Sequence, residues 1–181
     1  MPFSLAPIEE FERECQMHFA CYSMCRNGFA TEHESMAAIP NQVTTTHFHH
    51  HDTGVTKTTA SYRVFELRAM SAADGKFADL LAKSIVVSIY ARWDEYHRTR
   101  IATEHLVTKK AVGSDLMGDV RLIRNCIVHS NSILTDEPRK LKELPWALQP
   151  GLLTVTSSMM NSMFNRLNRE HIHIDHCPSK Q

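Results

Sequence analysis

The feature that most constrains the fold is a stripe of apolar side chains within residues 76–106. Its members recur at intervals of three and four residues, and they are Phe77, Leu80, Leu81, Ile85, Ile89, Trp93 and Tyr96. This spacing follows the 3.6-residue period of an α-helix and places the apolar groups on one side. A long helix of this kind needs other elements to cover its apolar side. We therefore predict a helical domain built around this segment.

Three further segments repeat the helical period, at about residues 7–35, 115–135 and 157–167. Side chains that can cap the two later helices stand at their starts, and they are Ser114 or Asp115 and Thr156 or Ser157. The segment 41–67 differs, because it is rich in threonine and in β-branched or aromatic residues. That composition predicts a β-hairpin or another extended excursion. The expected fold class is all-α, a helical bundle with a hairpin-like insertion near residues 41–67.

Length and charge limit the organisation and the partners. With 181 residues and 43% hydrophobic content, we expect one domain over residues 1–181, with a flexible tail at 172–181. Twenty Lys and Arg balance twenty Asp and Glu, so any contact with RNA must be local. The apolar run 85–90 is far shorter than the roughly 20 residues of a membrane span, and charged side chains near the start argue against a secretory leader. Five cysteines without CxxC spacing fit free thiols in a reducing compartment. We expect a soluble, cytoplasmic protein that does not associate with a membrane.

The segment that follows residue 114 carries the most reactive side chains. Its apolar residues form one straight stripe that we assign to the core: Leu116, Val120, Ile123, Ile127 and Leu134. The opposite side collects Gly118, Arg121, Asn125, Val128, His129 and Ser132. A glycine within a helix costs roughly 1 kcal/mol relative to alanine, and Val128 adds apolar surface away from the core. Both features suit a second helix that packs against this side.

The string from Arg124 to His129 (RNCIVH) matches the R-N-x-x-x-H signature of the HEPN superfamily. Two other strings, Arg92–Arg98 (RWDEYHR) and Pro150–Thr156 (PGLLTVT), are similar to one bacterial branch of that superfamily. The resemblance covers about residues 76–170 and leaves out the predicted hairpin. It implies a helical bundle that dimerises through the motif helix and, in catalytically active members, RNA cleavage without a metal. It also implies a setting of growth arrest or antiviral defence, with an antitoxin or defence protein as a further partner.

The residues of the motif suit that chemistry. Metal-independent cleavage needs a base for the ribose 2′-hydroxyl, an acid for the leaving 5′-oxygen and a cation beside the developing phosphorane. His129 can act as base or acid near neutral pH, and Arg124 can grip two phosphate oxygens. Asn125 either orients His129 or binds phosphate, while Arg121 either holds the RNA backbone or pairs with an acidic side chain. One chain supplies one such histidine, so a two-fold axis is needed to bring two together. Neither a metal nor another cofactor is expected.

Other interpretations stay open. Arg124 and His129 are also compatible with a surface cation and a satisfied histidine, or with a non-catalytic dimer that binds a nucleotide or RNA. A third function, a metal-binding regulator, would use the cluster His47, His49, His50, His51 and Asp52, of which alternate members share one side of a strand. The same metal-or-tail question applies to His171, His173, His176 and Cys177. Cys21 and Cys25 lie one helical turn apart, so they either share a metal or a redox event or are simply two small buried side chains. Asp94 and Glu95 either contact the motif helix or belong to a solvated face.

Overall fold

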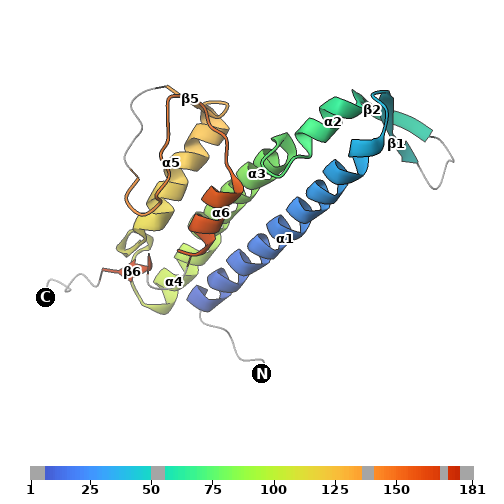
Figure 1. Cartoon of the computed structure of the whole chain (residues 1–181). Coiled ribbons are helices and arrows are strands. Elements are labelled where there is room, and N and C mark those ends of the chain that lie inside the picture. The colour runs from blue at the N-terminus through green and yellow to red at the C-terminus, as the bar shows by residue number, and fades with distance from the viewer. Residues whose placement is uncertain (1–6, 50–55, 136–140, 168–170, 176–181) are drawn as a thin grey trace, which may run out of the picture.

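The computed structural model describes residues 7–49, 56–135, 141–167 and 171–175, with the backbone alone for 45–49 and 56–60. Within these residues the fold is mainly helical, with three small two-stranded sheets (Figure 1). The mainly helical class predicted from the apolar periodicity is therefore confirmed. Over the same residues, no helix is both long enough and apolar enough to cross a membrane.

The long helix predicted around residues 76–106 is present as three consecutive pieces. These are α3 (Lys76–Arg92), a π-helical turn (Trp93–His97) and α4 (Arg98–Glu104). The π-helical turn was not predicted, because the apolar positions keep their three- and four-residue spacing through it. Such turns occur mostly as local interruptions of α-helices, often near functional sites. This turn buries Trp93 and His97.

Helix α1 (Pro7–Ser35) lies beside α3 and α4 and runs in the opposite direction (Figure 1). It buries Phe11, Cys15 and Tyr22, which recur at helical spacing. The ring of Phe11 lies 5.2 Å from that of Trp93, between centroids. Helix α1 thereby covers the apolar side of the long helix.

Helix α5 (Asp115–His129) begins as predicted but ends earlier. The hydroxyl of Ser114 caps it by accepting a hydrogen bond from the backbone N–H of Met117 at 3.2 Å. The predicted continuation to about Thr135 is wrong, because Asn131 and Ser132 have φ angles of 49° and 63°. The Ser132 N–H then donates to the Cys126 carbonyl at 3.0 Å, a left-handed helix end that asparagine tolerates.

Two of the small sheets lie around α5. After its end, β4 (Ile133–Leu134) pairs with β5 (Gly151–Leu152), so Leu134 belongs to a strand rather than to the helical stripe. At its start, β3 (Val112–Gly113) pairs with β6 (His173–Ile174). We had expected a flexible tail from residue 172, whereas residues 173–174 are paired with β3; residues 176–181 lie outside the described part.

The final helix, α6 (Ser157–Phe164), has the predicted cap. The Thr156 hydroxyl accepts a hydrogen bond from the Met159 N–H at 3.3 Å. Its Phe164 ring lies 4.8 Å from the ring of Phe19 on α1. Met160 and Met163 are fully buried, so α6 contributes to the core and packs against α1.

The predicted hairpin is present at the end of the molecule away from α5 (Figure 1). Strand β1 (Val43–His49) pairs antiparallel with β2 (Thr56–Arg63), with an irregularity between Thr46 and His47. The expected extended segment reached residue 67, but α2 (Val64–Met70) begins first. The Glu66 carboxylate explains this start, because it accepts a hydrogen bond from the Arg63 N–H at 3.1 Å.

Candidate functional site

Arg124, Asn125 and His129 lie together on the last turns of α5. Arg124 Nη1 donates a hydrogen bond to Asn125 Oδ1 at 3.1 Å. The same Nη1 lies 3.0 Å from His129 Nε2. Around the helix axis, the backbone positions of Arg124 and His129 point in directions about 140° apart. The long arginine side chain spans this offset. The three motif residues predicted from the sequence therefore form one cluster, with Arg124 at its centre.

The partner of His129 defines the state of its ring. A guanidinium has only donors, so Nε2 of His129 must accept the hydrogen bond from Arg124. The ring is then neutral and carries its proton on Nδ1. Asn125 accepts its hydrogen bond from Arg124 and makes none with His129, so its two expected roles, orienting His129 or binding phosphate, stay predictions. Arg124 Nε is buried and has no partner within the described residues.

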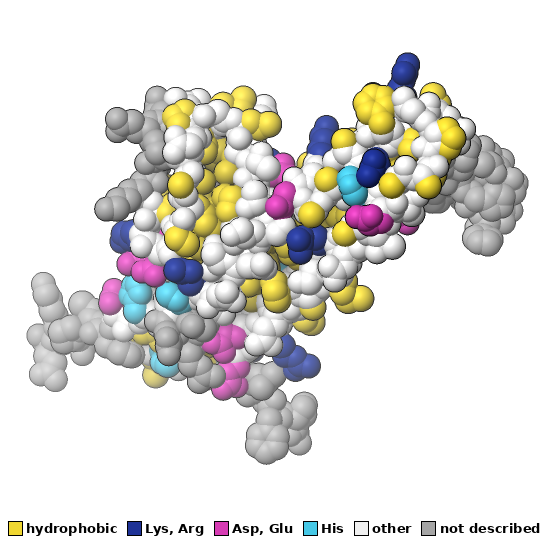
Figure 2. Space-filling model, in the orientation of Figure 1, with side chains coloured by type: hydrophobic (Ala, Val, Ile, Leu, Met, Phe, Trp, Pro, Cys, Tyr) yellow, Lys and Arg dark blue, Asp and Glu magenta, His cyan; other side chains and the backbone are white. Residues whose placement is uncertain are grey.

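The surface around His129 is open and partly apolar. Asn125 and His129 are both exposed. Val128 is 44% exposed, and across the β4–β5 pair Ile133 and Leu152 are 48% and 72% exposed. Figure 2 shows hydrophobic side chains gathered over the part of the molecule that contains α5 and β5. Ser132, which we had placed on the side opposite the core stripe, is buried and lies beyond the end of the helix.

Arg121 lies one helical turn before Asn125 and is exposed. It makes no hydrogen bond or ion pair with any residue that the structure describes, so its expected acidic partner is not found there. The charge of Arg121 affects the pKa of Tyr90 on α3. Burial raises the pKa of the Tyr90 hydroxyl, as does Asp94, while the charges of Arg121, Arg98 and Arg124 lower it. Three arginines thus act on one phenol between α3 and α5.

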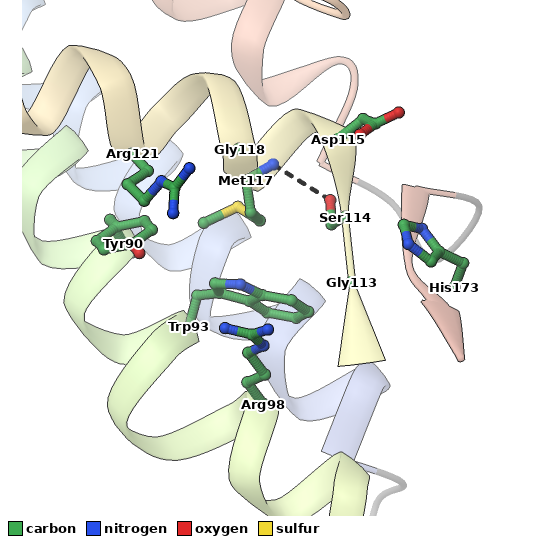
Figure 3. A pocket seen from close by; sticks show the side chains of 10 residues that line it. All are labelled: Tyr90, Trp93, Arg98, Gly113, Ser114, Asp115, Met117, Gly118, Arg121 and His173. Carbon is green, nitrogen blue, oxygen red and sulfur yellow. Dashed lines mark hydrogen bonds between the residues drawn. The ribbon is translucent and has the colours of Figure 1, made fainter. Parts of the chain in front are cut away.

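A pocket of about 240 Å³ opens beside Arg121 (Figure 3). It lies between the start of α5, the end of α3 with its π-helical turn, and the β3–β6 pair. The residues that line it include Tyr90, Trp93, Arg98, Ser114, Gly118 and Arg121. We name it the Arg121 pocket. The sequence analysis missed it, because its walls come from segments about 20 to 80 residues apart and no local pattern joins them.

The acidic pair before α4 does not reach the motif. Asp94 Oδ1 accepts a hydrogen bond from Arg98 at 3.1 Å, and Asp94 Oδ2 lies 3.2 Å from Lys109 Nζ. Burial raises the pKa of Asp94, but the hydrogen bonds of Arg98 and Lys109 outweigh it and the net shift is downward. Asp94 is therefore an ion-pair partner of α4 and the following 3₁₀ turn. Glu95 is exposed. The expectation that this pair tunes His129 has no support in these contacts.

A second histidine cluster lies on the other side of the long helix, and the sequence analysis missed it. Glu14 of α1 receives a hydrogen bond from Arg92 Nε at 2.7 Å and lies 2.6 Å from His97 Nε2. His97 is fully buried. Burial raises the pKa of Glu14, but the hydrogen bonds of Arg92 and His97 outweigh it and lower the pKa overall. Within the Arg92–Arg98 string, Arg92 and His97 thus hold α1 through Glu14.

The predicted metal ligands are not assembled in the described part of the chain. No group of three or more His, Cys, Asp or Glu side chains there is arranged to hold a metal ion. Cys21 is exposed and Cys25 half-buried, so the interpretation as two buried side chains is wrong for Cys21. His171 lies 3.8 Å from Glu143, and His173 lines the Arg121 pocket. Outside the described side chains lie His47, His49, His50, His51, Asp52, His176 and Cys177.

Comparison of the chain with protein-family models, with curated proteins and with solved structures found no significant match.

Proposed function

We propose that this protein is a metal-independent endoribonuclease of the HEPN type that acts as a symmetric dimer. The observation that carries the proposal is the cluster of Arg124, Asn125 and His129 on an exposed helix end. A neutral imidazole with an acceptor nitrogen is the form that a general base requires. A guanidinium beside it supplies the charge that a phosphate needs. No acidic side chain among the described residues neutralises Arg124.

In the proposed reaction, His129 takes the proton of a ribose 2′-hydroxyl. The resulting oxygen attacks the adjacent phosphorus, and the bond from phosphorus to the 5′-oxygen breaks. The leaving oxygen takes a proton from the His129 of a second copy, which must be in its protonated, imidazolium form, so the two histidines exchange protonation states and solvent restores them afterwards. Arg124 of both copies stabilises the charge on the phosphorane. The products are a 2′,3′-cyclic phosphate and a free 5′-hydroxyl, so no water or metal is consumed in this step.

Phosphate binding also frees the base in this scheme. In the structure, Arg124 donates to the same His129 nitrogen that must accept the proton. A phosphate oxygen is a stronger acceptor for a guanidinium than an imidazole is, because the pair is charged on both sides. When Arg124 turns to the phosphate, the lone pair of His129 Nε2 becomes available to the 2′-hydroxyl. The cluster therefore couples substrate binding to activation of the base.

The dimer in this proposal uses the apolar surface next to the motif. Val128 next to His129 is exposed, and so are Ile133 and Leu152 in the β4–β5 pair that follows the end of α5. Stable interfaces need apolar area at their centre, and a two-fold contact places each surface residue opposite its own copy. This is the arrangement that would bring the two His129 side chains together. Resemblance to the HEPN superfamily adds growth arrest or antiviral defence, and an antitoxin or defence protein, to the proposal.

The test is cleavage of a mixed RNA preparation in the presence of a metal chelator. We expect His129→Ala to lower the cleavage rate about 10²- to 10⁴-fold, the contribution of general acid–base catalysis. His105→Ala, an exposed histidine at the end of α4, is the matched control and should cleave normally. Val128→Asp should yield a monomer in sedimentation and lose cleavage. Retained cleavage by His129→Ala would refute the mechanism, and intact RNA with the unaltered protein, bound through Arg124, would indicate the non-catalytic dimer.

A further inference from the structure

The Arg121 pocket adjoins the proposed cleavage site. Arg121 lies three residues before Arg124 on α5, and both guanidinium groups act on the Tyr90 hydroxyl. Figure 3 shows the Arg121 side chain extending from α5 toward Tyr90 at the edge of the pocket. If an RNA strand is bound with one phosphate at Arg124, a neighbouring nucleotide of that strand would therefore reach the pocket. Arg121 of the pocket and Arg124 of the motif lie about one turn apart on α5.

The charges that line the pocket leave a net attraction for an anion. Arg98 is already occupied, since its Nε donates to the Val112 carbonyl at 2.7 Å and its Nη1 to Asp94. Asp115, the acidic residue of the lining, lies 2.8 Å from Lys142 Nζ. Arg121 is left without an ion pair among the described residues. One cation of the pocket is thus free to bind a phosphate.

The remaining walls suit a flat, partly apolar group. The half-buried ring of Tyr90 provides aromatic surface above the buried Trp93 and Met117, and Gly118 adds no side chain. A Cβ placed at Gly118 would meet nothing within 4 Å, so the space beside the helix is open at this point. The Ser114 hydroxyl accepts from Met117 N–H and keeps its own proton for a ligand acceptor. With about 240 Å³, the pocket is smaller than the roughly 300 Å³ at which sites for drug-sized molecules begin.

We propose that the Arg121 pocket receives one nucleotide of the RNA strand next to the cleaved linkage. Its base lies against Tyr90 beside Gly118, and its phosphate is bound by Arg121. This proposal rests on the proposed ribonuclease function for the origin of the ligand, an RNA strand. The binding site itself does not depend on catalysis. It provides a place at which the enzyme can prefer one base over another.

The experiment uses two substitutions in the pocket with a matched control for each. Gly118→Leu fills the open space on α5, and Gly28→Leu makes the same change at an exposed helical glycine of α1 whose Cβ position is also open. Arg121→Gln removes the free cation, and Arg13→Gln removes an exposed arginine of α1. All four are measured for folding by circular dichroism. The probes are the four nucleoside monophosphates, inorganic phosphate, and an RNA oligonucleotide.

Calorimetry should show a nucleoside monophosphate binding to the full chain. We expect Gly118→Leu and Arg121→Gln each to weaken this binding about tenfold or more, while Gly28→Leu and Arg13→Gln retain it. His129→Ala should also retain it, so nucleotide binding persists even if catalysis through His129 proves wrong. With the oligonucleotide, Gly118→Leu should raise KM more than it lowers kcat.

Three results would overturn the proposal. The first is equal nucleotide affinity in the unaltered protein and in both folded pocket variants. The second is inorganic phosphate binding as tightly as any nucleotide, since the pocket would then recognise no base. The third is nucleotide binding that depends on the pocket while the KM for the oligonucleotide stays unchanged in Gly118→Leu. In that case the ligand is a free nucleotide and not a unit of the strand.

Discussion

Two histidines of this protein each lie beside an arginine, and their partners give them opposite chemistry. At His97, Nε2 faces the carboxylate of Glu14, which can only accept, so this nitrogen is the donor. At His129, the same nitrogen faces the guanidinium of Arg124 and is the acceptor. His97 is fully buried and the arginine beside it is neutralised by Glu14, whereas His129 is exposed and Arg124 has no acidic partner among the described residues.

The difference separates a structural tie from a reactive site. The Glu14 cluster joins α1 to the π-helical turn through residues more than 75 positions apart, and its charges are balanced internally. The Arg124 cluster is local to one helix and leaves a positive charge and a basic nitrogen at the surface. The Glu14 cluster, with its balanced charges and its buried histidine, contributes to folding. The Arg124 cluster has an unbalanced charge at the surface and is free to receive an anion. The following predictions test this distinction, beginning with the largest expected effect.

Substitution of Arg124 and of Arg92, one at a time, should separate the effect on activity from the effect on stability. Arg124→Gln removes the cation from the proposed phosphate site and should lower RNA cleavage about 10²- to 10³-fold, with little change in stability. Arg92→Gln should leave the cleavage rate per folded molecule unchanged, because its side chain contacts Glu14 and not α5. Cleavage assays and urea unfolding of both variants provide the measurement. The comparison fails if Arg92→Gln loses cleavage while its folding is intact.

Removal of Glu14 should cost stability and spare activity. Glu14→Ala leaves the Nε2–H of buried His97 without its acceptor, which destabilises the fold by about 1–3 kcal/mol. The midpoint of urea unfolding should therefore shift to a lower urea concentration. Glu34→Ala, at an exposed position of the same helix, is the control and should unfold as the unaltered protein does. An unchanged midpoint in Glu14→Ala would mean that this cluster is not the tie between α1 and the long helix.

The same carboxylate should make stability depend on acid pH, a smaller effect. The pKa of Glu14 in the folded protein is lowered from 4.5, so in the interval between the two values the unfolded state binds more protons. Stability from this group is present above the unfolded pKa and is lost as the pH falls through the lower folded pKa. Unfolding measured between about pH 3 and pH 6 should show a shallower decline in Glu14→Gln. Equal pH slopes in the two proteins would contradict the cause assigned to this shift.

Much of the fold followed from local patterns. The starts of α1, α3, α5 and α6 agree with the apolar period and with the caps at Ser114 and Thr156, because both signals depend on near neighbours. The end of α5 did not follow. The apolar spacing continued to Leu134, while a left-handed turn at Asn131 directs that residue into a strand paired with β5. Helix ends depend on such turns and on distant strands that no helical period reports.

The candidate site divides in the same way. Arg124, Asn125 and His129 were found from the sequence, since they lie within one and a half turns of one helix and match a known motif. Sequence reasoning had left Asn125 with two roles, orienting His129 or binding phosphate, and the contact that the structure gives it, with Arg124, was neither of them. The Arg121 pocket and the Glu14 cluster were missed. Each needs side chains from at least two segments far apart in the chain, and neither leaves a spacing that a single sequence can reveal.

The sequence by itself determined where helices begin and that Arg124 and His129 share one of them. Helical period and side-chain length are local properties, and they suffice for this. Only the tertiary structure decided that His97 meets the carboxylate of Glu14 and that Arg121 borders an open pocket. These outcomes depend on how α1 packs on the long helix and how α3 and β6 pack beside α5, because burial and charge pairing between distant segments arise only when those segments come together.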